Sequence, residues 1–316
     1  IPLRLVGSEM CIRDRYKNTS AQLVSIKEKP FKLEREIQKI FENNLFTIMG
    51  IELVKSEFTI KNKRIDSLGF DPQTKAFVII EYKRERNSSV VDQGFTYLSL
   101  MLQNKADFIL EYNENNQKIL KRNDVDWSQS RVAFVSPSFT DNQKEAVNFR
   151  DLAIELWEIK RYEGELISIN PIRKTNAAES IKPIMQKNTE FKQVADEIKV
   201  YTEENLLQGK SDDIVELYEK YKNAILNLSV DIEVKPQKWY ISFKKGNSII
   251  CAIEIQKSNL KLYINVTKGN LDDGKHLTRD VSNLGHLGSG DYELKINDDA
   301  NLEYILSLVK QAIIEV

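Results

Sequence analysis

RIDSLGFDPQTKAFVIIEYK, residues 64–83, is the stretch that decides the expected fold of the first half of this chain. Asp71 and Pro72 fit the first two positions of a type I turn, so the residues on either side are predicted to form paired strands. The second strand, AFVIIEYK, is apolar and β-branched up to Glu81, which is typical of a central strand buried on both faces.

Two acids and an amine lie near the ends of these strands. Glu81 and Lys83 are two residues apart, so their side chains emerge on the same face of the strand. Asp66 lies on the neighbouring strand, from which it can approach Glu81 across the ladder. Mg²⁺ takes one or two carboxylates plus waters and substrate phosphate, and it lowers the pKa of a bound water. A nearby lysine can orient that water or stabilise charge on the phosphate, so this set predicts phosphodiester cleavage.

Helix and strand patterns around this stretch predict an α/β domain with a mixed sheet over residues 16–170. Leu33, Ile37, Ile40 and Phe41 recur at helical spacing, which indicates an amphipathic first helix. Further helices are expected over 89–106 and 142–156, strands over 51–60, 107–112 and 131–137, and a strand pair or one bent strand over 157–172.

Two of these helices carry polar residues that suit the same site. Glu34 on the first helix is placed to reach a metal directly or through water. Gln93 and Tyr97 are four residues apart on the later helix and share one face, where they can hold substrate or the active-site strands.

The order of these motifs resembles the PD-(D/E)XK nuclease superfamily. LEREI resembles the first helix of archaeal-type Holliday junction resolvases, RIDSLGFD the Asp motif, and IIEYK the Glu-x-Lys motif. QGFTY resembles the helix motif of the branch that includes RecB-type exonucleases and NucS-type mismatch endonucleases. The resemblance covers residues 30–110 and extends more weakly to 170. It implies a restriction-endonuclease-like core of αβββαβ topology that hydrolyses DNA or RNA with a divalent metal.

The resemblance also implies roles for individual residues. Asp66 and Glu81 become ligands of Mg²⁺ or Mn²⁺, Lys83 lies at the nucleophilic water, and Glu34 is an accessory acid of the metal. Glu36 is a competing choice for that helix acid.

One residue departs from the family motif. Ile65 stands before Asp66 where the motif has proline, a substitution that many members share. Basic residues flank the motifs and are expected to contact nucleic-acid phosphates without reading sequence. They are Lys61, Lys63, Arg64, Arg84 and Arg86.

Bulk composition narrows the alternatives. Net charge is −1, so any nucleic-acid binding depends on a local basic patch rather than a global basic field. The presence of only two histidines weighs against zinc chemistry. The two cysteines give no disulfide framework, which indicates a reducing cytoplasm. No apolar stretch has the length of a membrane span. Residues 1–15, IPLRLVGSEMCIRDR, resemble an adapter-derived peptide of translated environmental assemblies and are expected to be non-native.

The second half is predicted to be a separate, small α+β domain. Residues 171–210 are charged and sparsely apolar, which is typical of a linker, and residues 211–316 contain a helix, several strands and a final helix. The segment WYISFKKGNSIICAIEIQKSNLKLYINV resembles a domain of unknown function found in so-called predicted transport proteins.

Three functional hypotheses follow. The first is a Mg²⁺- or Mn²⁺-dependent nuclease acting on DNA, with RNA as the alternative substrate; the oligomeric state is open, and a dimer is one option. The second is a non-catalytic nucleic-acid-binding or interaction protein with the nuclease fold. The third is a ligand-sensing or transport-associated cytoplasmic protein that acts through the C-terminal domain. A solvated strand end would also explain the charges of residues 81–86.

Overall fold

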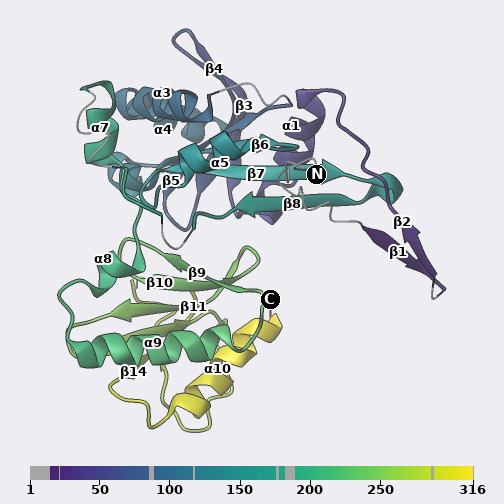
Figure 1. Ribbon diagram of the computed structural model, residues 1–316. Coiled ribbons are helices and arrows are strands. Elements are labelled where there is room, and N and C mark those ends of the chain that lie inside the picture. The colour runs from purple at the N-terminus through teal and green to yellow at the C-terminus, as the bar shows by residue number, and fades with distance from the viewer. Residues whose placement is uncertain are drawn as a thin grey trace, which may run out of the picture.

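The chain is built around two six-stranded sheets in the computed structural model (Figure 1). The structure describes residues 15–20, 22–84, 89–116, 118–175, 178–181, 189–285 and 288–315. The peptide that the sequence predicts to be non-native, residues 1–15, lies outside this part except for Arg15.

The first sheet has the strand order β3-β4-β5-β6-β7-β8. Strands β5, β6 and β7 are parallel, and the pairs on either side are antiparallel, which makes the sheet mixed, as predicted. The strands are β3 (Glu52–Ile60), β4 (Lys63–Asp71), β5 (Ala76–Tyr82), β6 (Arg131–Ser136), β7 (Ile154–Arg161) and β8 (Ile167–Ile172). The helices are α1 (Glu34–Asn43), α2 (Leu45–Met49), α3 (Val90–Gln103), α4 (Lys105–Asn116) and α5 (Asp141–Val147).

Strand β5 is buried at every position because helices cover both faces of the sheet. Ile37 and Phe41 of α1 pack with Ile80 on one face. Phe95 and Leu98 of α3 belong to the core on the other face. The elements α1, β3, β4, β5, α3 and β6 follow the predicted αβββαβ order, with α2 and α4 inserted. Glu81 therefore lies at the carboxyl end of a strand that is closed to solvent on both sides.

Two sequence predictions of secondary structure were wrong. Residues 107–112 were predicted to be a strand but belong to helix α4. Phe108 and Tyr112 lie four residues apart and are both buried, so a helix buries the apolar side chains of this short run equally well. The helix predicted over residues 142–156 ends at Val147, and Ile154 already begins β7, where it is fully buried.

Residues 171–210, predicted to be a linker, contribute in part to the first core. Helix α7 (Thr189–Glu197) packs against α3. Val194 and Ile198, four residues apart, are buried in the same core as Phe95. The few apolar residues of this charged stretch are therefore spaced to cover α3. Helix α8 (Glu203–Leu207) follows and leads to the second sheet.

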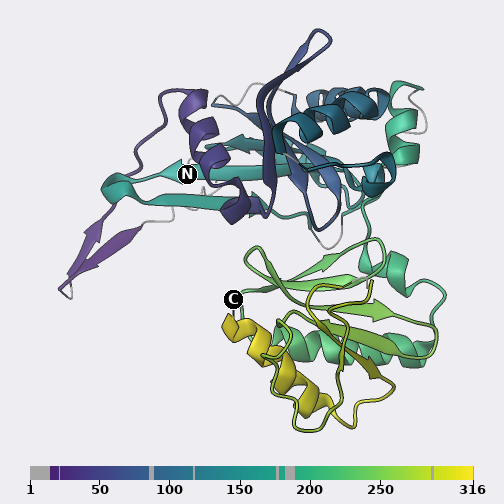
Figure 2. The same cartoon turned by 180° about the vertical axis from the view of Figure 1, so that it is seen from behind.

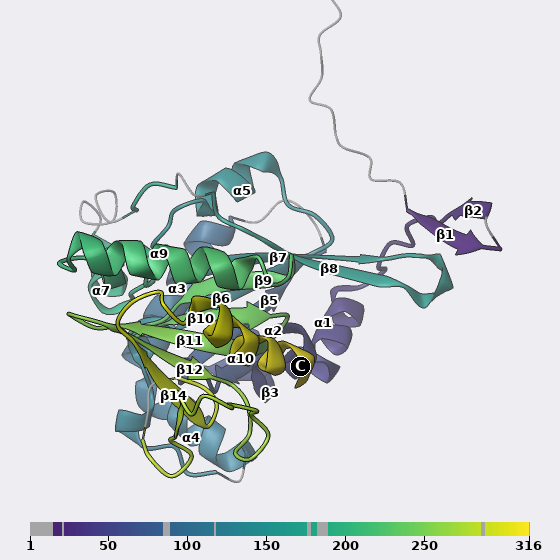
Figure 3. The same ribbon diagram turned by 90° about the horizontal axis from the view of Figure 1, so that it is seen from below.

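The second sheet is antiparallel, with the order β13-β14-β12-β11-β10-β9. Helices α9 (Asp212–Leu226) and α10 (Leu302–Glu315) pack on one face of it (Figure 3). The strands are β9 (Ile232–Pro236), β10 (Ile241–Lys245), β11 (Ser248–Ile255), β12 (Leu260–Ile264), β13 (Arg279–Asp280) and β14 (Tyr292–Ile296). This arrangement is α+β, as predicted, and it has an apolar core of its own.

Polar contacts join the two parts at the end of the first sheet that is remote from Glu81. Lys244 Nζ donates to Gln73 Oε1 at 3.3 Å, and Lys238 Nζ lies 3.3 Å from Asp126 Oδ2. Burial and the neighbouring Lys235 lower the pKa of Lys244 to about 8. The strands β9 and β10 face this junction, as Figure 2 also shows from behind.

A buried ion-pair network lies beside the junction. Arg131 contacts Asp71 Oδ2 and Glu155 Oε1, each at 3.0 Å. Burial alone would raise the pKa of Asp71, but the Arg131 guanidinium holds that pKa below its ordinary value.

A two-stranded hairpin, β1 (Tyr16–Thr19) with β2 (Gln22–Ser25), precedes the first sheet and extends away from it (Figures 1 and 2). In the part of the chain that the structure describes, no helix has both the length and the apolar character needed to cross a bilayer.

Candidate active site

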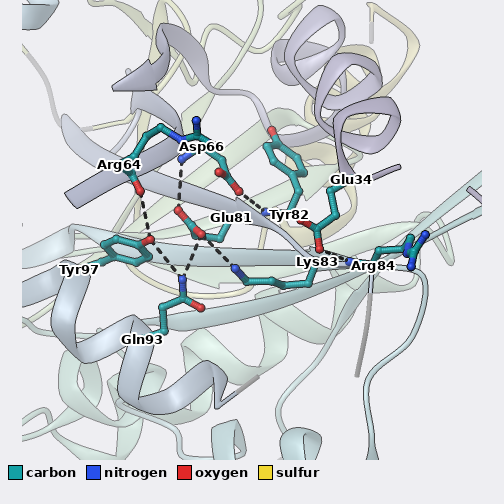
Figure 4. A network of polar contacts seen from close by, with 9 residues as sticks. All are labelled: Glu34, Arg64, Asp66, Glu81, Tyr82, Lys83, Arg84, Gln93 and Tyr97. Atoms are coloured by element: carbon teal, nitrogen blue, oxygen red, sulfur yellow. Dashed lines mark hydrogen bonds and ion pairs between the residues drawn. The ribbon is translucent and has the colours of Figure 1, made fainter. Parts of the chain in front are cut away.

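The pairing of β4 with β5 brings Asp66 and Glu81 together (Figure 4). Ser67 pairs with Ile80, so the antiparallel register sets Asp66 directly opposite Glu81 at the end of the ladder. The Asp66 N–H donates to Glu81 Oε1 at 3.2 Å, and the Tyr82 N–H donates to Asp66 Oδ2 at 3.0 Å. Each acid is thus held by the backbone of the opposite strand.

Lys83 completes this arrangement. Its Nζ lies 3.4 Å from Glu81 Oε2, as expected for residues that share one face of a strand. The Lys83 N–H donates to the carbonyl of Val135 at 2.8 Å, which ties the strand end to β6. The Glu81 side chain is only 3% exposed and that of Lys83 is 22% exposed, so the pair lies at the boundary between core and solvent.

Burial changes the acidity of both carboxyl groups. It raises the pKa of Glu81 to about 7, and repulsion from Asp66 adds to this effect. Burial also raises the pKa of Asp66, although the Tyr82 N–H and Lys83 oppose the increase. Perturbed acids with a charged partner are typical of functional sites.

Gln93 and Tyr97 of α3 reach the same carboxylate from the other side. Gln93 Nε2 donates to Glu81 Oε2 and to the Tyr97 hydroxyl, each at 3.2 Å. The Tyr97 hydroxyl donates to the Arg64 carbonyl at 3.4 Å. Gly94 allows α3 to pack closely on β7, since a Cβ there would lie 2.4 Å from Ile154 Cδ1.

Glu34 lies at the edge of the site rather than at its centre. Its Oε1 accepts a hydrogen bond from the Arg84 N–H at 2.8 Å, immediately after Lys83. Its negative charge acts on Asp66. Glu36, the competing helix acid, instead pairs with Arg161 at 3.1 Å. The structure thus brings Glu34, and not Glu36, to Asp66.

A supporting network on α1 was not predicted from the sequence. Gln38 Nε2 donates to the Asp66 carbonyl and to Glu42 Oε1, each at 3.1 Å. Glu42 Oε1 in turn accepts from the Ser67 hydroxyl at 2.6 Å, and Ser67 contacts the Tyr82 hydroxyl at 3.1 Å. The sequence does contain a signal for this network, because Glu34, Gln38 and Glu42 are four residues apart and therefore share one helix face.

The predicted phosphate-contacting residues lie near the site and are exposed. Lys61 lies in the turn between β3 and β4, Lys63 is the first residue of β4, and Arg64 follows with a 3.7 Å contact to Glu57. Arg84 is also exposed, and its Nη1 donates to the Lys32 carbonyl at 2.8 Å. Arg86 lies outside the described residues.

Asp66 and Glu81 suit a Mg²⁺ or Mn²⁺ ion that keeps most of its waters better than an ion whose ligands all come from the protein. Among the described residues, no group of three or more His, Cys, Asp or Glu side chains is arranged to enclose a metal. Asp66 and Glu81 nevertheless place two carboxyl groups beside the single amine of Lys83. Mg²⁺ needs only one or two carboxylates because it retains several waters.

Comparisons with solved structures give distant matches. A repair endonuclease from Pyrococcus abyssi is 20% identical with a TM-score of 0.22, and the match covers 38% of this chain and 45% of that one. The EndoMS-dsDNA2 complex is 19% identical with a TM-score of 0.26, and the match covers 43% and 60%. The chain thus spans less than two thirds of either protein.

Comparisons of sequence are more specific. Residues 203–313 match the model of the domain of unknown function DUF5655, which agrees with the resemblance expected for the second half. An uncharacterized protein from Haemophilus influenzae is 54% identical over 298 residues, which cover 94% of this chain and 98% of that protein. The chain therefore belongs to the same family as this Haemophilus influenzae protein.

Proposed function

We propose that this chain is a metal-dependent nuclease that hydrolyses phosphodiester bonds in DNA, built on a PD-(D/E)XK-type αβββαβ core. One observation carries the proposal: the buried Glu81 carboxylate meets both the Asp66 N–H and Lys83 Nζ at the end of a closed strand. An acid is costly to bury unless its site compensates for its charge. Two acids to hold a divalent metal and an amine beside them are the groups that phosphodiester hydrolysis needs.

Asp66 and Glu81 are the residues that would hold the metal. A bound Mg²⁺ or Mn²⁺ supplies an acidified water and neutralises charge on the phosphate. Both carboxylates are oriented before any ion arrives, since each accepts a hydrogen bond from the opposite strand. Such preorganisation lowers the cost of assembling the site.

Lys83 has a separate task. Its ammonium group is held 3.4 Å from Glu81 Oε2, where it can hydrogen-bond the attacking water and stabilise charge that develops on the phosphate. Gln93 restrains the Glu81 carboxylate through its 3.2 Å hydrogen bond, and Tyr97 restrains Gln93. Glu34 orders the backbone just after Lys83 and adds negative charge for the hydrated ion.

The basic residues beside the site favour a nucleic acid as the substrate. Lys61, Lys63 and Arg64 lie just before Asp66, and Arg84 follows Lys83, so cations flank the acids on both strands. Contacts of this kind fix a phosphate backbone without reading bases. DNA is the substrate that we propose, and RNA is the alternative that the assay below includes.

Cleavage by the full chain tests the proposal. Purified protein is incubated with supercoiled plasmid, labelled double-stranded DNA and labelled RNA, each with Mg²⁺, Mn²⁺ or EDTA. We expect hydrolysis of DNA with either metal and none with EDTA, because the carboxylates alone cannot acidify a water. The variant Glu81→Gln serves as the control for contaminating nucleases and should be inactive.

Two results would contradict this proposal. Equal cleavage by the Glu81→Gln variant would show that the activity comes from elsewhere. Binding of DNA without hydrolysis under either metal would instead favour a non-catalytic nucleic-acid-binding protein with this fold.

A further inference from the structure

The N-terminal hairpin and the residues that follow it, together residues 16–29, have a firmly held base. We call this segment the N-terminal arm. The Lys29 N–H donates to the Arg161 carbonyl at 2.8 Å, and the Glu163 N–H donates to the Lys27 carbonyl at 3.0 Å. The base is thereby fixed to the end of the β7–β8 pair.

The rest of the arm has no core of its own. Tyr16 is 51% exposed, Leu23 is 68% exposed and Val24 is 54% exposed. Leu23 and Val24 are consecutive on β2, so they lie on opposite faces of the hairpin, where they pair with Asn18 and Lys17. Neither face packs against the body, as all described β1 and β2 residues are exposed. An isolated two-stranded hairpin is only marginally stable in water, which points to a binding partner.

The charge of the arm favours an anionic partner. Along residues 16–29 the sequence contains three basic residues and one acid, Glu28. That acid is already engaged, since its Oε2 lies 3.6 Å from Lys160 Nζ. The basic residues are Lys17, Lys27 and Lys29. On a chain whose net charge is −1, this excess of basic residues gives the arm a local positive potential that suits phosphate groups.

The base of the arm connects directly to the candidate active site. After Pro30 the chain reaches Lys32, whose carbonyl accepts from Arg84 Nη1 at 2.8 Å. Two residues later, Glu34 Oε1 accepts from the Arg84 N–H, next to Lys83. Arg161 Nη2 also donates to the Pro30 carbonyl at 2.9 Å. The arm therefore leaves the body at the same end of the sheet as the acids.

We propose that the N-terminal arm is a second contact for the phosphate backbone of double-stranded DNA, beyond the basic residues that flank the acids. The inference rests on the proposed function in one respect: the duplex held by the arm is the substrate of the Asp66–Glu81 site. The arm extends the contacted length of the duplex and carries no sequence specificity.

Charge reversal on the arm tests this inference in the full chain. The variant Lys17→Glu/Lys27→Glu alters two exposed side chains, and Lys295→Glu/Lys310→Glu makes the same change in charge on the C-terminal part. Fluorescence anisotropy with a short labelled DNA duplex in EDTA measures the dissociation constant over about 50 to 200 mM salt. Losing two phosphate contacts should reduce the slope of log K against log salt by about 2 and weaken binding roughly tenfold.

The control variant should bind like the wild type. The proposal is overturned if the arm variant and the control have the same affinity and salt slope, or if the wild type does not bind the duplex. It is also overturned if the arm variant binds DNA like the wild type but has a different oligomeric mass in sedimentation, because the arm would then bind a second copy of the chain. Binding that depends on the arm without any cleavage would contradict the proposed nuclease and leave the arm's role intact.

Discussion

Replacing Lys83 by methionine is expected to lower the rate of DNA cleavage at saturating substrate by about 10²–10³-fold. Methionine keeps much of the length of the side chain but removes the ammonium group beside Glu81. A group that stabilises charge only in the transition state changes the rate constant more than the affinity. Single-turnover cleavage and anisotropy in EDTA measure the two quantities separately.

Lys63→Met is the matched control for this prediction. Lys63 is the exposed first residue of β4, so its loss should weaken duplex binding and leave the single-turnover rate at saturation nearly unchanged. A Lys83→Met variant that cleaves at the wild-type rate, or that loses only affinity, would remove Lys83 from the proposed chemistry.

Replacing Arg131 by alanine is expected to lower the free energy of unfolding by about 3–5 kcal/mol. The substitution leaves the carboxylates of Asp71 and Glu155 without the guanidinium that contacts each at 3.0 Å. The Asp71 side chain is only 7% exposed, so water compensates poorly for the loss. Urea unfolding at neutral pH, followed by circular dichroism, measures the change.

Arg150→Ala provides the comparison at an exposed ion pair. Arg150 and Glu204 lie 2.8 Å apart with side chains 48% and 74% exposed, so the expected cost is below about 1 kcal/mol. Equal costs for the two variants would contradict the role assigned to the Arg131 network.

The cost of Arg131→Ala should also depend on pH. The folded-state pKa of Asp71 is held below its ordinary value, so this group contributes stability above about pH 3.9 and loses that contribution as the pH falls. Once the carboxyl is protonated, the missing guanidinium matters less. The difference between wild type and variant should therefore shrink below about pH 4, and a constant difference would argue against the mechanism.

Local pattern was enough to predict that Asp66, Glu81 and Lys83 lie close together. The alternation of β5 places Glu81 and Lys83 on one face, and their side chains are in contact. The turn at Asp71 sets the register, which brings Asp66 opposite Glu81. Both contacts involve residues that are close in sequence or joined by one hairpin, so they could be predicted from the sequence.

Features that depend on distant packing were missed. The run at residues 107–112 has no distinguishing period, and its helical form follows from packing of Phe108 and Tyr112 in the core. The Arg131 network joins residues from three strands, and nothing in their spacing announces it. The N-terminal arm was missed for another reason: its strands pair only with each other, and their apolar residues are too few to give a strong pattern.

The central claim is that Asp66 and Glu81 together bind a divalent cation, and calorimetric titration of the full chain with Mn²⁺ tests it most directly. The wild type and Glu36→Gln, which changes the acid paired with Arg161, should each bind Mn²⁺ with the same affinity. The double variant Asp66→Asn/Glu81→Gln should lose this binding while remaining folded by circular dichroism. Wild-type protein that binds no Mn²⁺, or a double variant that binds it equally well, would contradict the claim.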